Sequence, residues 1–329
     1  MDKSDLLLTN LSIAGSYYDV SLYSGLLYLW NSPKEVSIYH WHKLMNHLTL
    51  NQLPIYQEPL TNQSLFMEEN DLRPFLFKSL VFNFSVRDSF IFRHRLYFID
   101  EEGFKVCYPE NADTTSKLLV RGEFHQAIIG NNYRMILVSH TEGIYDCNKG
   151  TIIPWDDTPT FSVEFHDNAI LQMDEKGQPI QLLIFESQKR EPYLLKKISH
   201  EKLQKNKTFF NTSLDFNDAT APEVEAINLF QFLSTDKTPS KKAMGNSVPI
   251  SKMPPRYLTT LTLDDQALSI EETNNSLTLR LGTEQYIYLN DYNRYRLYHK
   301  SQDYKNHLHL ISQNHVSLFM FHELTQSFA

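Results

Sequence analysis

The chain has 329 residues, with 39 acidic against 31 basic side chains and a formal net charge of −8. This length permits one large or two medium domains. Sequence-independent binding of nucleic acid needs clustered lysine and arginine, so the acidic balance disfavours a DNA or RNA reader.

The two cysteines and the apolar pattern bear on the compartment. Cys107 and Cys147 are too few for a disulfide framework and lack metal-ligand spacing, so we expect reduced thiols. The first residues lack the apolar run of a signal peptide, and no stretch approaches the roughly 20 apolar residues of a membrane helix. We therefore expect a soluble, cytoplasmic protein without a membrane segment.

Short runs of alternating apolar and polar residues, joined by polar turns, recur along the first 200 residues. This pattern predicts β-hairpins. The predicted hairpins, each written as strand, turn and strand, are 22–30, 31–34 and 35–42; 90–99, 100–103 and 104–108; 133–138, 139–143 and 144–146; and 169–173, 174–177 and 180–185.

Two segments interrupt this pattern. Within residues 43–80, Ser64 followed by Glu68 predicts a short helix with Ser64 as its N-cap. Residues 200–256 are rich in Lys, Asn, Thr, Ser and Pro, and helical spacing over residues 220–233 predicts a helix in a long insertion. Such an insertion is functional, disordered or a cover for a sheet edge. We expect residues 234–252 to be the most mobile ordered part of the chain.

The hairpin pattern returns after the insertion. The predicted units are 267–270, 274–275 and 277–281; 286–289, 290–293 and 295–298; and 308–311, 312–314 and 316–321. Residues 35–44 and 315–324 align without a gap, Val36-Ser37 matching Val316-Ser317. We therefore expect the first and last hairpins to lie in adjacent or shared sheets, with Ile38 and Leu318 on the same side of the molecule.

The recurring hairpins over residues 10–200 and 257–324 resemble β-propeller proteins of the WD40-like type. The Gly-His and Trp-Asp signature of that family is absent, since Trp155-Asp156 follows a proline in an expected loop. Propeller blades of about 40–50 residues imply six or seven blades. The resemblance thus implies an all-β fold, a β-propeller of residues 1–329 closed by N- and C-terminal hairpins, with a partly helical insertion at 200–256.

Histidine pairs are the weak candidates for metal ligands. His40 and His42 fall in the first repeat and His307 and His309 in the last, and His-x-His on a strand places both rings on one face. Only Glu35 and Glu323 supply nearby carboxylates. We therefore expect these histidines to share a hydrophobic or solvent face, with no metal and no cofactor.

Catalytic signatures are sparse. The sequence has no Gly-x-Ser-x-Gly, no glycine-rich phosphate loop and no dinucleotide-binding pattern. Acidic pairs such as Asp156-Asp157, Asp264-Asp265 and Glu271-Glu272 are the kind of group that glycoside hydrolysis uses, although in turns they are expected to be solvated. We therefore expect no catalytic residues.

Aromatic side chains are the candidates for a binding surface, because Tyr, Trp and Arg dominate interface hot spots. The residues concerned are Trp30, Trp41, Tyr288, Tyr292 and Tyr295. The alternative is that they pack between blades.

We thus expect a non-catalytic protein–protein interaction module that binds a protein partner on its rim, with residues 200–256 in the contact surface. It would be a subunit of a cytoplasmic complex in defence, regulation or toxin neutralisation. One alternative is a carbohydrate-active hydrolase or lyase with carboxylates at the propeller axis, which acids and an arginine converging there would favour, whereas a plugged apolar channel would favour the module. Another is a nucleic-acid-binding accessory protein that uses Lys196 to Lys207 and Lys237 to Lys242.

Overall fold

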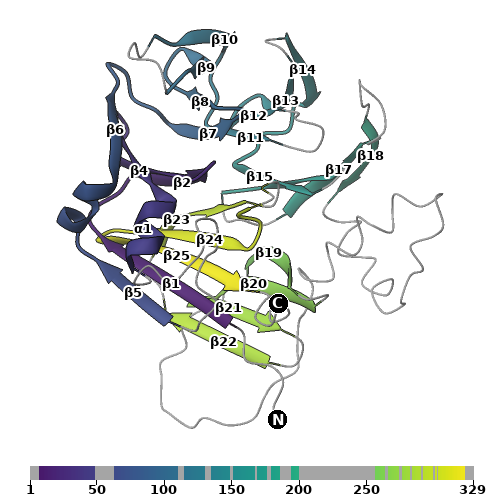
Figure 1. Ribbon diagram of the computed structural model, residues 1–329. Coiled ribbons are helices and arrows are strands. Elements are labelled where there is room, and N and C mark those ends of the chain that lie inside the picture. The colour runs from purple at the N-terminus through teal and green to yellow at the C-terminus, as the bar shows by residue number, and fades with distance from the viewer. Residues whose placement is uncertain are drawn as a thin grey trace, which may run out of the picture. The chain divides into compact units, whose positions relative to one another are not determined.

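The structure, a computed structural model, is all-β in the residues that it describes (Figure 1). These residues are 7–48, 63–109, 115–129, 135–148, 151–166, 169–175, 179–185, 194–199, 256–263, 266–273, 276–281, 284–289, 292–298, 301 and 303–322. They form strands β1 to β25, one α-helix and one 3-10 helix. No helix in these ranges is long and apolar enough to cross a membrane. The helix expected at 220–233 and the segment 234–252 lie outside them.

Five sheets have four strands each, nearly all taken in chain order. They are β2 (Asp19–Tyr23), β3 (Leu26–Ser32), β4 (Glu35–His40) and β6 (Leu76–Val81); β7 (Asp88–Phe92), β8 (Arg95–Ile99), β9 (Gly103–Cys107) and β10 (Lys117–Arg121); β11 (Gln126–Ile129), β12 (Met135–Ser139), β13 (Gly143–Asn148) and β14 (Thr151–Asp156); β15 (Ser162–His166), β16 (Ala169–Met173), β17 (Pro179–Phe185) and β18 (Leu194–Ser199); and β19 (Arg256–Leu263), β20 (Gln266–Thr273), β21 (Ser276–Leu281) and β22 (Glu284–Leu289).

A further sheet has five strands and joins the two ends of the chain. Its order is β23 (Tyr292–Leu297), β24 (His307–Ser312), β25 (His315–His322), β1 (Leu7–Ala14) and β5 (Gln63–Met67). Small meandering sheets repeated along the chain are the construction of a β-propeller, so the resemblance to that fold is confirmed.

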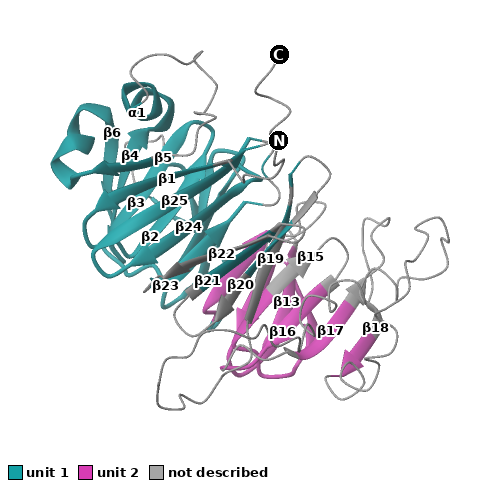
Figure 2. Cartoon of the chain, turned by 90° about the horizontal axis from the view of Figure 1, so that it is seen from below, with its two compact units in different colours: residues 1–123, 259–270, 275–329 teal, residues 124–258, 271–274 magenta. Residues whose placement is uncertain are grey.

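The chain divides into two compact units (Figure 2). Unit 1 comprises residues 1–123, 259–270 and 275–329, and unit 2 comprises residues 124–258 and 271–274. In both units the core lies between neighbouring sheets. In unit 1, Trp30 and Ile38 of β3 and β4 pack against Phe98 of β8. In unit 2, Val138 of β12 packs in one cluster with Ile170 of β16.

The sheet that contains the last hairpin also contains the first strand of the chain. β1 pairs antiparallel with β25, Leu11 opposite Leu318, and pairs parallel with β5 on its other side (Figure 1). The first and last hairpins were expected in adjacent or shared sheets. Residues 35–40 form β4 in the sheet of β2, β3, β4 and β6, and β2 of that sheet contacts β23 and β24 of the sheet that contains the last hairpin, so the two hairpins lie in neighbouring sheets. The match between residues 35–44 and 315–324 therefore reflects two third strands of similar pattern in neighbouring sheets.

Two predicted single strands are each a pair of strands. Residues 22–30 contain a two-residue turn at Ser24 and Gly25, and residues 90–99 contain another at Arg93 and His94. Only Gly25 among these four is a strong turn residue. The alternation of apolar and polar residues therefore continues through both turns and does not mark them. Residues 286–298, predicted as one hairpin, contribute β22 and β23 to two different sheets.

The helices also differ from the prediction. α1 (Trp41–Leu48) begins directly after β4, so residues 41 and 42 are helical rather than extended. Ser64 lies in β5, and the 3-10 helix η1 (Glu69–Phe75) begins after Glu68, which forms a reciprocal capping box with Asp71. The helix therefore begins at Glu69, four residues later than an N-cap at Ser64 would place it.

Two glycines occupy equivalent positions in successive sheets. Gly103 begins β9 and Gly143 begins β13, with positive φ of 145° and 83°. A Cβ at either site would lie 2.2 Å or 2.0 Å from a backbone carbonyl oxygen of the last strand, at Val120 or Asp156. Both positions therefore require glycine, as the turns predicted at 100–103 and 139–143 indicate.

Candidate functional site

Acidic and arginine side chains converge on the first strands of three sheets in unit 1. Asp19 begins β2, Asp88 begins β7, and Arg294 and Arg296 lie two residues apart on β23. Arg296 Nε donates to Asp19 Oδ1 at 2.9 Å, and Arg296 Nη2 donates to Asp88 Oδ1 at 2.7 Å and to Asp19 Oδ2. We call these four residues the acid–arginine cluster.

The cluster is a buried, mutually neutralising arrangement. The side chain of Asp19 is 1% exposed, whereas that of Arg294, which donates to Asp19 Oδ2 at 3.1 Å, is 34% exposed. Burial opposes the charge of Arg296, but the carboxylates of Asp19 and Asp88 hold its pKa well above the ordinary value. Each buried charge is therefore paired, and these ion pairs link β2, β7 and β23, the first strands of three sheets.

A second cluster lies beside the same strands. Tyr298 Oη forms a hydrogen bond with His309 Nδ1 at 2.9 Å. The same hydroxyl accepts a hydrogen bond from the Leu22 N–H of β2 at 3.1 Å. His307 Nδ1 lies 3.4 Å from His309 Nε2, and Tyr304 Oη accepts the Gly25 N–H at 2.8 Å. These four side chains, Tyr298, Tyr304, His307 and His309, form the histidine–tyrosine cluster, which satisfies one backbone donor of β2 and one of the turn that follows β2.

The weak metal candidates are only partly brought together. His307 and His309 are buried side by side, with ring centroids 5.6 Å apart. His40 contacts Phe77 instead, and His42 lies on α1, so the two do not share a strand face as predicted. Among the described residues, no group of three or more His, Cys, Asp or Glu side chains could hold a metal ion.

The aromatic residues that were predicted to bind a partner differ in how exposed their side chains are. Trp30 stacks on Phe82 and Trp41 lies beside His307, and both tryptophans are almost wholly buried. Tyr292 and Tyr295 lie on β23 and are partly exposed. Tyr288 lies on β22, and its side chain lies outside the described part of the structure.

A polar network in unit 2 involves one of the acidic pairs. Asp156 Oδ1 accepts from Gln172 Nε2 at 3.3 Å and from Gln181 Nε2 at 2.5 Å, and Asp156 Oδ2 pairs with Lys197. Burial opposes ionisation of Asp156, but the hydrogen bonds from Lys197 and Thr158 lower its pKa. Asp156 is therefore a buried structural acid rather than a solvated turn residue, and Lys197 is engaged within the protein.

The outer strand β6 of unit 1 exposes several large apolar side chains. β6 is the outer strand of its sheet, and Leu76, Phe77 and Val81 on it are 45%, 48% and 66% exposed. We call these three side chains the outer-strand surface. Large apolar side chains grouped on a sheet edge mark contact sites or aggregation hazards.

Several of these residues were missed by sequence reasoning. Asp19 and Arg296 are 277 residues apart, and nothing in a single sequence links them. All but the last residue of β6 lies in the segment 43–80, where no hairpin was predicted, although the apolar residues of 75–81 were a usable signal of a strand.

Comparisons with known proteins give no family. No protein-family model matches the sequence, and no curated protein sequence matches it significantly. Among solved structures, the chain is similar to a luciferin-regenerating enzyme (6% identity, TM-score 0.49, covering 94% of both chains) and to the N-terminal domain of Nup159 (7% identity, TM-score 0.48, covering 94% of this chain and 90% of that one). It is also similar to BBS1N in complex with ARL6DN (8% identity, TM-score 0.40, covering 92% and 77%). At these scores the likenesses carry no argument about function.

Proposed function

We propose that this chain is a non-catalytic protein-binding module whose partner docks along β6. The observation that carries the proposal is the outer-strand surface. A strand edge with exposed Leu76, Phe77 and Val81 suits a partner that adds an extended segment to the sheet, since main-chain hydrogen bonds then give affinity and side chains give specificity. The chain would be the binding subunit of a cytoplasmic complex that contains this partner.

The proposal also includes the other features that the sequence analysis predicted: the aromatic binding residues, the single propeller and the role of the insertion. Tyr292 and Tyr295 are its surface candidates on β23, and Trp30 and Trp41 serve packing. We retain a single propeller of six or seven blades over residues 1–329, and a contact role for residues 200–256, as predictions.

Site-specific photo-crosslinking tests the proposal. A benzophenone amino acid at position 77 should give one discrete crosslinked protein in the native host, identified by mass spectrometry. The same photoreactive residue at the exposed Arg121 of β10 is the control, and Val81→Glu should abolish the product. A product that forms equally from both positions, or that survives Val81→Glu, would contradict docking along β6.

The acid–arginine cluster bears on the second candidate, a carbohydrate-active enzyme, because it brings two carboxyl groups and two arginines together. A glycosidase uses one carboxyl group to protonate the leaving oxygen and another as base or nucleophile. Here both oxygens of Asp19, and Oδ1 of Asp88, accept arginine N–H groups, which suits a structural role better than proton donation. Turnover of aryl glycosides that is lost in Asp88→Asn, with the fold retained, would establish the enzyme instead.

The nucleic-acid alternative has the least support. Of its two lysine groups, Lys237 to Lys242 lies outside the described residues, and Lys197 pairs with Asp156. Binding of an oligonucleotide with a steep salt dependence that Lys197→Gln reduces would revive it.

A further inference from the structure

The turn between β7 and β8 is an exposed, basic and conformationally strained element of unit 1. Arg93, His94 and Arg95 are consecutive and exposed, and we call them the basic turn. Arg93 and His94 have φ of 49° and 58°, the left-handed region that β-hairpin turns normally fill with Asn-Gly. Such strain persists where surroundings fix it, and it concentrates at functional sites.

Neighbouring aromatic rings hold the basic turn in place. The ring of Tyr23, at the end of β2, lies edge-on to His94 with centroids 5.5 Å apart, and its hydroxyl accepts the His94 N–H at 3.3 Å. The guanidinium of Arg93 lies 5.2 Å from the Phe92 ring centroid, and that of Arg95 lies 5.1 Å from that of Tyr108. An arginine already restrained on a ring loses less side-chain entropy when it binds an anion.

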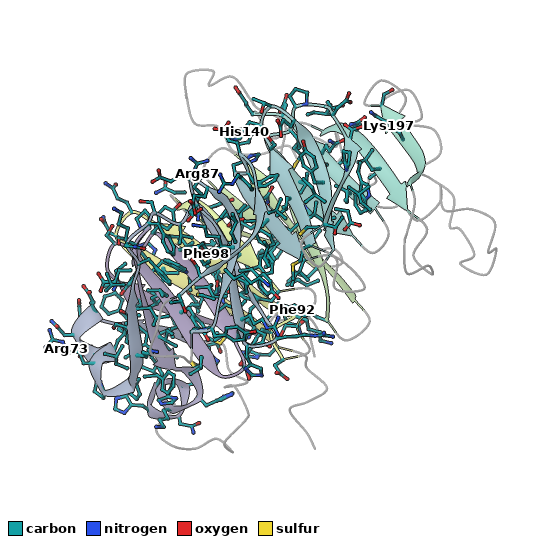
Figure 3. All side chains as sticks on the ribbon, turned by 90° about the horizontal axis from the view of Figure 1, so that it is seen from above. Arg73, Arg87, Phe92, Phe98, His140 and Lys197 are labelled. Carbon is teal, nitrogen blue, oxygen red and sulfur yellow. The ribbon has the colours of Figure 1, made fainter. Side chains whose placement is uncertain are left out.

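The described acidic residues of this sheet lie away from the basic turn. Arg93 and Arg95 lie at the end of β7 and the start of β8, whereas the described acids of the sheet lie at the opposite end. These acids are Asp88, Asp100, Glu101 and Glu102. Figure 3 shows the two ends of β7, marked by Arg87 and Phe92. At the basic end, Lys78 of β6 donates to the Pro109 carbonyl oxygen at 3.1 Å and adds a further cation. Glu110 and Asp113, next in the sequence, lie outside the described residues.

We propose that the basic turn, with Lys78 and Tyr108, binds an acidic peptide segment of a protein partner. Arginine binds a carboxylate through two parallel N–H bonds, and Arg and Tyr are the side chains that dominate protein interfaces. This proposal deepens the proposed function, on which it rests, because it names the chemistry of the partner and a second contact surface.

A nucleic acid fits the same surface less well. Single strands need aromatic faces on which bases can stack, and here the faces of Phe92 and Tyr108 carry the chain's own arginines. The net charge of −8 also repels a long polyanion more strongly than it repels a short acidic segment.

Fluorescence anisotropy with the full chain tests the inference. The probes are a labelled ten-residue glutamate-rich peptide, a neutral peptide of equal length and a single-stranded oligonucleotide of equal charge. The test variant is Arg93→Glu/Arg95→Glu. The matched control is Arg87→Glu/Arg121→Glu, which reverses two exposed charges at the opposite end of the same sheet.

We expect the acidic peptide to bind more tightly than either other probe and to weaken as salt rises. We expect the test variant to lose at least tenfold in affinity and the control variant less than twofold. Equal losses in both variants, no binding of the acidic peptide, or tighter binding of the oligonucleotide would each overturn the inference. Crosslinking from position 77 reports on the proposed function separately, since a crosslinked partner there without peptide binding would leave that function intact.

Discussion

At the residue scale, Arg296 is the main ion-pair partner of two buried carboxylates, those of Asp19 and Asp88. Replacing it with Met leaves Asp19 and Asp88 without their main partner, so we expect the free energy of unfolding to fall by about 3–5 kcal/mol. Arg294→Met removes a one-third exposed side chain with a single bond to Asp19 and should cost less than about 1 kcal/mol. Urea unfolding of both variants measures the difference, and equal losses would contradict the assigned role of Arg296.

The buried His309 should make stability depend on pH. Burial, and next the proximity of His307, hold the pKa of His309 well below its ordinary value of 6.5. Below pH 6.5 the unfolded chain therefore binds a proton that the folded chain does not bind. The free energy of unfolding should fall by up to ~1.4 kcal/mol per pH unit as pH drops from 6.5 towards the pKa of the folded state.

Comparison of two histidine variants isolates this effect. In His309→Gln, which retains a hydrogen-bonding group for Tyr298, the decline below pH 6.5 should become shallower than in the unmodified chain. His140→Gln, at an exposed position of unit 2, should leave the decline unchanged. Denaturant unfolding between pH 5 and 7.5 measures it, and parallel curves for the unmodified chain and His309→Gln would contradict the prediction.

At the scale of elements, the turn between β7 and β8 should carry a cost in stability. Arg93→Asn/His94→Gly supplies the residues that this turn geometry favours, so we expect stabilisation by about 1–2 kcal/mol. Ser24→Asn in the turn between β2 and β3 should gain less, because Gly25 already occupies its second position. Thermal unfolding compares the two, and a loss of stability in the double variant would show that the turn is not strained.

Sequence reasoning succeeded for elements with strong local signals. The hairpins at 133–146, 169–185 and 308–321 were predicted because polar turn residues separate two alternating runs, and β12–β13, β16–β17 and β24–β25 confirm them. α1 was missed although its buried Trp41, Leu44 and Met45 have helical spacing, because the apolar run of β4 leads into it without a capping residue.

At the scale of the whole molecule, the sequence did not show which strands far apart in the chain pair with one another. The propeller class follows from repeated hairpins, but the partner of β25 could not be read from residues 35–44, since any third strand with the same alternation matches equally well. The ion pairs between the first strands could not be predicted from the sequence either. Asp88 and Arg296 are 208 positions apart, and their pairing depends on which sheets are neighbours. The candidate site was therefore less predictable than the fold.

Whether the chain unfolds as one domain can be tested with its three tryptophans. Trp30 and Trp41 lie in unit 1 and Trp155 in unit 2, so 5-fluorotryptophan gives a ¹⁹F resonance for each unit. Leu11 is fully buried in β1, opposite Leu318 of β25, and Leu11→Ala should cost about 2–5 kcal/mol. We propose a single cooperative domain, for which this variant lowers the urea midpoint of all three resonances together. Independent units would instead leave the midpoint of Trp155 unchanged while those of Trp30 and Trp41 fall. The control is Leu76→Ala at an exposed site on β6, which should leave all three midpoints within error of the unmodified chain.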